Sequence, residues 1–100
     1  MSNTSFLEKT RQLIENAPIA GHDPDAKVRH LLEAEYLRRL ARYRHSDLLL
    51  TRKYQMTFVE FISRRIVREK EYSWDSESDA MEWETAISGM ETMECHLNLL

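Results

Sequence analysis

Only a few side chains stand at spacings that could support chemistry. Glu91 and Cys95 are one helical turn apart and His96 follows Cys95, so these side chains could approach one metal ion. A structural zinc site needs four closely spaced ligands, and the sequence holds one cysteine. We therefore interpret the three residues as the exposed end of a helix, and we predict no metal site.

Two aspartates fall in the apolar rows of predicted helices. Asp47 and Asp79 would both lie on the core side, where paired carboxylates can serve acid–base chemistry. The structural interpretation is that each lies near a helix end and binds an arginine or a tyrosine hydroxyl. Arg64 and Arg65 are the candidate arginines, and we favour this structural role.

Motifs for catalysis or cofactor binding are missing from the sequence. It has two glycines in 100 residues, too few for a loop that cradles phosphate. Neither a GxSxG nucleophile turn nor an HExxH metal motif occurs. We therefore predict a protein that is not an enzyme, with no catalytic residue and no cofactor.

Composition favours a small folded protein. The chain is 42% hydrophobic and 31% charged, which fits one domain over residues 1–100 with a modest core. The single cysteine excludes an internal disulfide framework and is typical of a reducing compartment. The longest apolar run is Leu48–Leu50, far shorter than a membrane span. We expect a cytoplasmic protein with no membrane contact.

Capping signals divide the chain into four predicted helices, so the predicted fold class is all-α. A capping box at Ser5–Glu8 opens a short N-terminal helix that runs to about Asn16, and a linker follows to residue 23. Asp23 and Pro24 open a long helix that runs to about residue 54. A capping box at Thr57–Glu60 opens a short helix to about Lys70, and Ser73, Asp75 or Ser76 caps the last helix.

Apolar spacing indicates how these helices pack. Two adjacent rows at seven-residue spacing predict the core side of the long helix. The first row is Arg29, Tyr36, Tyr43 and Leu50, and the second is Glu33, Leu40, Asp47 and Tyr54. The core side of the last helix is predicted from a 3–4 spacing: Trp83, Ala86, Ile87, Met90, Met93, Leu97. Gly89 lies outside this row and could mark a close helix contact. The short third helix would turn Phe58, Phe61, Ile62 and Ile66 inward.

We therefore predict an antiparallel hairpin over residues 24–100, with the short helix at its corner. A second stripe on the long helix suggests another neighbour: Leu37, Ala41, Arg44, Leu48. Either the N-terminal helix covers this stripe or it exchanges with a second copy. A purely structural homodimer built on the two-faced long helix is therefore one alternative function.

Charge is strongly segregated along the chain. The net charge is −3, but residues 24–54 carry +4 and residues 72–100 carry −7. The two segments could neutralise each other within the fold, or one of them could face a partner. A basic face could instead follow a nucleic-acid backbone, and the residues for this alternative are Arg38, Arg42, Arg52, Arg64 and Arg65.

The acidic last helix suggests a protein partner. Glu77, Glu84 and Glu91 recur every seven residues and predict an acidic ridge. Exposed ion pairs contribute only about 0–1 kcal/mol each, so such a ridge would govern partner choice more than affinity. Apolar anchors would supply affinity, and the candidates off the core side are Trp74, Met81 and Leu99. The structural alternative for Trp74 is a hydrophobic staple packed at the corner.

One stretch of the sequence also resembles known proteins. The segments Tyr54–Phe61, Tyr72–Asp79 and Met81–Glu84 resemble a group of small, all-helical bacterial and cyanobacterial proteins. Members of that group accompany a toxin and are regarded as antitoxins. The resemblance, over roughly residues 36–97, implies a neutralising protein partner and no catalytic residue. Our leading functional prediction is thus an interaction protein of the antitoxin type.

Overall fold

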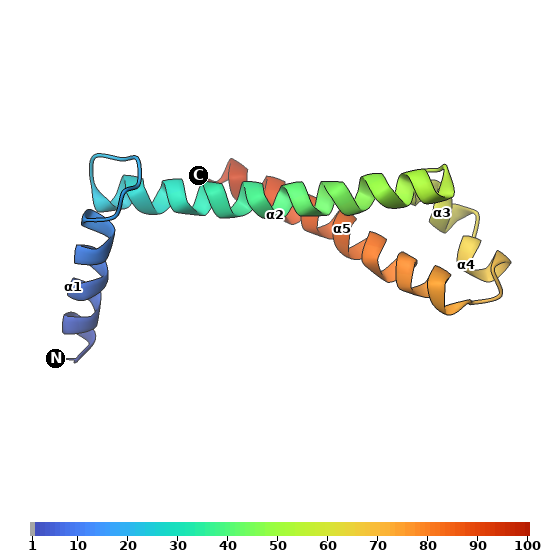
Figure 1. Cartoon of the computed structure of the whole chain (residues 1–100), viewed down its shortest axis with the longest axis horizontal. Helices are drawn as coiled ribbons and strands as arrows, with labels where there is room; N and C mark the ends of the chain where they lie inside the picture. Colours follow the sequence, from blue (N-terminus) through green and yellow to red (C-terminus); the bar gives the residue numbers. More distant parts are fainter. Residues whose placement is uncertain (1) are drawn as a thin grey trace.

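The protein folds into helices joined by short connections (Figure 1). The computed structural model describes the backbone of residues 2–100 and the side chains of residues 7–100. No strand occurs in that part of the chain, so the predicted all-α class is confirmed. The helices, in chain order, are α1 (Ser2–Glu15), α2 (Pro24–Tyr54), α3 (Phe58–Ser63), α4 (Ile66–Glu69) and α5 (Trp74–Asn98).

The predicted hairpin is also confirmed. Helices α2 and α5 run antiparallel and make most of the tertiary contacts, while α3 and α4 form the corner at one end (Figure 1). Helix α1 leaves the opposite end of α2 at a steep angle. The molecule is consequently elongated, with principal extents of 60 × 27 × 20 Å.

Local capping accounts for the helix starts. The Asp23 side chain accepts a hydrogen bond from the Ala26 amide at 2.7 Å, and Pro24 occupies the first helical position. Thr57 accepts from the Glu60 amide at 3.2 Å, as the capping box predicts. Ser73, rather than Asp75 or Ser76, caps α5. Each of these bonds spans three residues, so the sequence pattern alone could locate it.

The corner differs from the single short helix predicted over residues 57–70. Arg65 takes a left-handed conformation, with φ of 52°, and this residue separates α3 from α4. The break redirects the chain so that Phe61 and Ile66 are both buried, whereas Ile62 is exposed. The prediction that Ile62 faces inward was therefore wrong, because it assumed one continuous helical face.

The core is small and lies at the corner end of the hairpin. Trp83 is fully buried at its centre, and the rings of Tyr54, Phe58 and Phe61 lie within 6 Å of it. The Trp83 indole donates a hydrogen bond to the Asp47 carboxylate at 2.8 Å. Ile66 completes the core at the corner, and four other buried apolar side chains extend it along the hairpin: Leu40, Leu50, Ala86 and Met93.

Helix α1 is only partly as predicted. It begins at Ser2, three residues before the predicted capping box, because neither proline nor glycine interrupts Ser2–Thr4. The side chains of Ser5 and Phe6 lie outside the described residues. The end of α1 contacts the start of α2, where Lys27 donates to the backbone oxygens of Glu15 and Ala17.

The leucines of the second stripe of α2 remain exposed, and within the described part of this chain Arg44 alone of the stripe forms an ion pair with α5. Helix α1 does not cover it, and both Leu37 and Leu48 are about half exposed. The predicted core row also stops short at its other end, where Arg29 is exposed and pairs with Asp25. The reason is geometric: α5 ends near Tyr36, whose ring stacks on His96 at 5.2 Å, so the first turns of α2 extend beyond it.

The molecule exposes an unusually large surface. Its accessible area is 7768 Å², whereas a compact chain of 11.9 kDa exposes about 5,900 Å². Its radius of gyration is 20.0 Å, compared with about 13 Å for a compact domain of 100 residues. None of the described helices combines the length and hydropathy required to cross a membrane.

Candidate protein-interaction site

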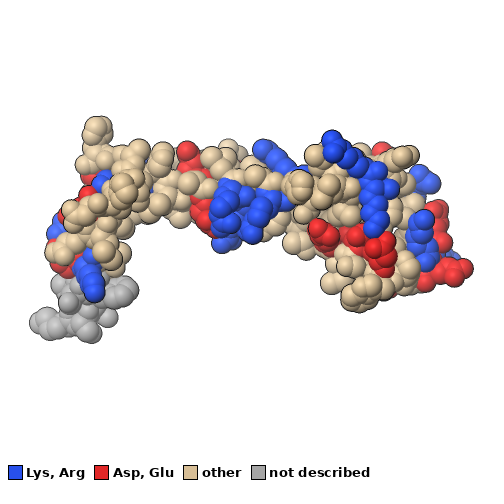
Figure 2. Space-filling model, viewed as in Figure 1, with Lys and Arg blue, Asp and Glu red and all other residues tan. Residues whose placement is uncertain are grey.

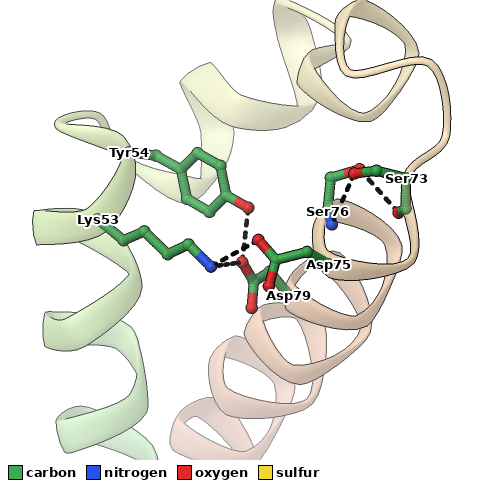
Figure 3. Close-up of polar contacts among 6 residues, drawn as sticks. All are labelled: Lys53, Tyr54, Ser73, Asp75, Ser76 and Asp79. Atoms are coloured by element: carbon green, nitrogen blue, oxygen red, sulfur yellow. Dashed lines mark hydrogen bonds and ion pairs between the residues drawn. The ribbon is translucent and has the colours of Figure 1, made fainter.

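A polar cluster fastens the start of α5 to the end of α2 (Figure 3). The Lys53 ammonium group donates to Asp79 at 2.6 Å and to Asp75 at 2.8 Å. The Tyr54 hydroxyl donates to the same Asp79 carboxylate at 2.6 Å. The side chain of Asp79 is 13% exposed, so this carboxylate is less hydrated than that of Asp75.

This cluster confirms one part of the aspartate prediction and corrects another. Asp79 does bind a tyrosine hydroxyl, but its cationic partner is Lys53 and not Arg64 or Arg65. Asp47 binds the indole of Trp83 and neither an arginine nor a tyrosine. Both carboxylates accept hydrogen bonds within the hairpin, which is the structural role that the sequence favoured.

The cluster also perturbs the acid–base properties of its members. Burial, reinforced by the hydrogen bond to Asp79, raises the pKa of Tyr54 from 10.0 to about 12. The hydrogen bonds to Asp75 and Asp79 raise the pKa of Lys53 above its ordinary range. Both shifts favour the protonated forms in the folded state, so the cluster is stabilising below pH 10.0 and weakens as the pH rises toward 12.

We expect one late-titrating tyrosine in the folded protein. In an alkaline titration followed by phenolate absorbance, the Tyr54 step should appear near pH 12, about two pH units above a free tyrosine. Tyr54→Phe should remove that step, and Tyr72→Phe, which changes an exposed ring, should leave it in place. A titration in which Tyr54→Phe removes an ordinary step near pH 10 would contradict the assignment.

The first turns of α5, which also carry Asp75 and Asp79 of the polar cluster, border an apolar hollow of about 500 Å³ together with helix α4. Val67 and Ala80 line it together with Trp74, Glu77 and Met81. The Trp74 side chain is 84% exposed and that of Met81 is 71% exposed. Trp74 is therefore not the packed staple that a structural role would require. The structure thus brings together three of the five residues predicted to bind a partner.

A second hollow of about 350 Å³ adjoins the first. Val67 borders both, and the second is also lined by Ile62, Arg65, Arg68 and Tyr72. Ile62 and Tyr72 are exposed, so the apolar surface continues across the corner. Sequence reasoning missed Val67 and Tyr72 because their places depend on the break at Arg65.

The remaining acidic residues follow α5 away from this surface. Glu84 lies seven residues beyond Glu77, and Glu91 seven beyond that, about 21 Å from Glu77 along the helix axis. All three are exposed, and none forms an ion pair within residues 7–100. The predicted ridge is therefore available to a partner, although only Glu77 borders the hollow.

The basic residues predicted for nucleic-acid binding come from two parts of the fold, α2 and the corner. Arg38 and Arg39 both pair with Glu35, and these contacts lower the pKa of Glu35 to about 2. Arg42 and Arg52 are exposed and carry no ion pair in the described part of the chain, and the same holds for Arg64 and Arg65 at the corner. Lys and Arg side chains gather over the middle of α2 and again near the corner (Figure 2).

The chain partly neutralises its own charge. Among the described residues, only two basic residues of α2 reach α5: Arg44 pairs with Glu94 at 3.5 Å, and Lys53 pairs with the two aspartates of the cluster. Most of the acidic ridge and of the basic face therefore remain without a counterion from the facing helix. The expected mutual neutralisation of the two segments is consequently small.

The C-terminal end of α5 shows no metal-binding geometry. No group of three or more potential metal ligands occurs within the described residues. His96 stacks on Tyr36, and Cys95 is exposed. These contacts give His96 a packing role at the end of the hairpin.

Comparisons with protein-family models, with curated proteins and with solved structures return no match. The class of protein is therefore defined by architecture alone: an elongated helical hairpin with an apolar hollow at its corner. The site must be interpreted from its own residues.

Proposed function

We propose that this chain is a non-enzymatic interaction protein whose corner surface binds a basic protein partner. The observation that carries the proposal is the hollow between Trp74 and Met81, two large side chains that remain mostly exposed beside the unpaired Glu77. Tryptophan is enriched among residues that dominate binding energy, and methionine adapts to irregular partner surfaces. An apolar centre beside an acidic border favours a partner with an apolar protrusion next to lysine or arginine side chains.

The surface area supports the same proposal. The chain exposes about 1,900 Å² more than a compact protein of its mass, while a standard interface buries about 800 Å² on each partner. The polar cluster of Lys53, Tyr54 and Asp79 holds α5 in place, so Trp74 is presented from a fixed helix start. Such preorganisation lowers the entropy lost on binding. That the partner is a toxin rests on the sequence resemblance alone.

The test separates the acidic border from the apolar anchor. The tagged protein would be expressed in its native host, and the proteins that copurify at fixed stoichiometry would be quantified by mass spectrometry. Glu77→Lys combined with Glu84→Lys and Glu91→Lys should lower recovery of the same partner at least about tenfold, because reversed charges repel a basic surface. Trp74→Ala should have a similar effect through loss of the anchor.

A matched control places the same charge change on another element. Glu33→Lys alters an exposed acidic residue of α2, near the end of the hairpin opposite the corner, and should leave recovery of the partner within about twofold. Equal recovery with the wild type and with the triple α5 variant would refute the proposal.

A further inference from the structure

Helix α2 carries a second, separate surface. Leu37, Ala41, Arg44 and Leu48 follow one another at spacings of four, three and four residues, which is the pattern of a coiled-coil seam. Leu37 and Leu48 are about half exposed, and the one ion pair between the seam and another described element is that of Arg44 with Glu94 of α5. The excess surface of the molecule is large enough for two standard interfaces, so the corner does not account for all of it.

We propose that this seam binds a second copy of the chain in an antiparallel homodimer. In a two-fold dimer the same patch meets itself, so a patch with unbalanced charge would repel its own equivalent. The acidic ridge of α5 and the face of α2 that presents Arg42 and Arg52 both carry such unbalanced charge. The seam does not, because its only charged member, Arg44, is paired with Glu94 of its own chain. Charge therefore permits a two-fold contact at this seam, whereas it opposes one at the acidic ridge and at the basic face.

The spacing of the seam also defines its register. With a two-fold axis between residues 42 and 43, Leu37 lies opposite Leu48 of the partner subunit, and Ala41 lies opposite Arg44 of the partner subunit. The small Ala41 side chain leaves room for the aliphatic part of that arginine, whose charged end can remain with its Glu94. The seam is thus self-complementary in size as well as in charge.

The same register also sets how far the two long helices overlap. Residue 31 of one copy lies opposite residue 54 of the partner subunit, where the partner's α2 ends. The first turns of α2 therefore extend beyond the paired region, and the seam residues alone define the interface.

Two adjacent leucines provide a matched test. Leu48 is 45% exposed and Leu49 is 50% exposed, but only Leu48 belongs to the seam. In sedimentation equilibrium the purified wild-type chain should have twice its 11.9 kDa mass. Leu48→Glu should weaken self-association at least about 100-fold, because the two-fold contact buries the charge twice, whereas Leu49→Glu should change it less than about twofold. Helical circular dichroism should be unchanged in both variants.

Crosslinking tests the register. In a Cys95→Ser background, a mixture of Leu37→Cys and Leu48→Cys chains should form a disulfide-linked dimer on mild oxidation. Neither variant alone should do so, since its two cysteines would lie about 16 Å apart along the seam. A wild-type monomer at all concentrations, or equal dissociation by Leu48→Glu and Leu49→Glu, would overturn the homodimer. Efficient crosslinking of Leu37→Cys with itself would overturn the antiparallel register. The corner site lies outside this seam, so either proposal can fail without the other.

Discussion

Trp83→Ala should lower the free energy of unfolding by about 3–5 kcal/mol, while Trp74→Ala should change it by less than about 0.5 kcal/mol. The two substitutions remove the same atoms from the same helix. Trp83 is 0% exposed and fills the centre of the small core, so its loss leaves a cavity between Tyr54, Phe58 and Phe61. Trp74 contacts mainly solvent.

The loss at Trp83 has a polar component as well. Removing the indole leaves the Asp47 carboxylate without its donor, and a half-buried acceptor without a partner is destabilising by about 1–3 kcal/mol. Trp83→Phe retains an aromatic ring but not the N–H group. Its free energy of unfolding should therefore lie between those of the wild type and Trp83→Ala. Typical domains have only about 5–15 kcal/mol of stability, so Trp83→Ala should unfold much of the population on mild warming.

Urea unfolding followed by far-ultraviolet circular dichroism, at one protein concentration for all variants, measures these differences. Equal destabilisation by Trp74→Ala and Trp83→Ala would contradict both the core assignment and the exposure of the corner. If Trp74→Ala leaves the free energy of unfolding unchanged but abolishes recovery of the partner, Trp74 contributes to binding and not to folding.

Gly89→Ala should destabilise the hairpin by about 1–2 kcal/mol, although alanine is the better helix former. A Cβ atom at position 89 would lie 2.6 Å from Cδ2 and Cζ of Tyr43 and closer still to its Cε2. Overpacking of this kind is destabilising by about 1–3 kcal/mol, while the helix propensity gained is about 1 kcal/mol. The steric effect is the larger one, because the ring is held between α2 and α5.

The sign of this effect should reverse when the ring is removed. In a Tyr43→Ala background, Gly89→Ala should stabilise the protein by up to about 1 kcal/mol, since only the helix propensity remains. The four proteins of this double-mutant cycle isolate the coupling between the two positions. Ser88→Ala, at the adjacent exposed position, controls for propensity and should be neutral or slightly stabilising. A stabilising Gly89→Ala in the wild-type background would show that α2 and α5 are not in this close contact.

The sequence by itself determined the local features of this protein. Asp23 and Pro24, Thr57 with Glu60, and Ser73 locate helix starts, because a cap is a hydrogen bond between residues three positions apart. Helical periodicity is also a local property, so the spacing along the last helix predicted its buried side: Trp83, Ala86, Met93. The isolated glycine at position 89 likewise indicated a close helix contact, since glycine is an unfavourable residue inside a helix unless a neighbour needs its space.

The tertiary structure alone decided which distant residues meet. Lys53 and Asp79 are 26 positions apart, and their contact depends on the register of α2 against α5. The exposure of Trp74 and the hollow beside Val67 depend on the direction that the chain takes after the break at Arg65. A left-handed arginine has no local sequence signal, because packing of Phe61 and Ile66 into the shared core outweighs the preference of Arg65 for a right-handed helix.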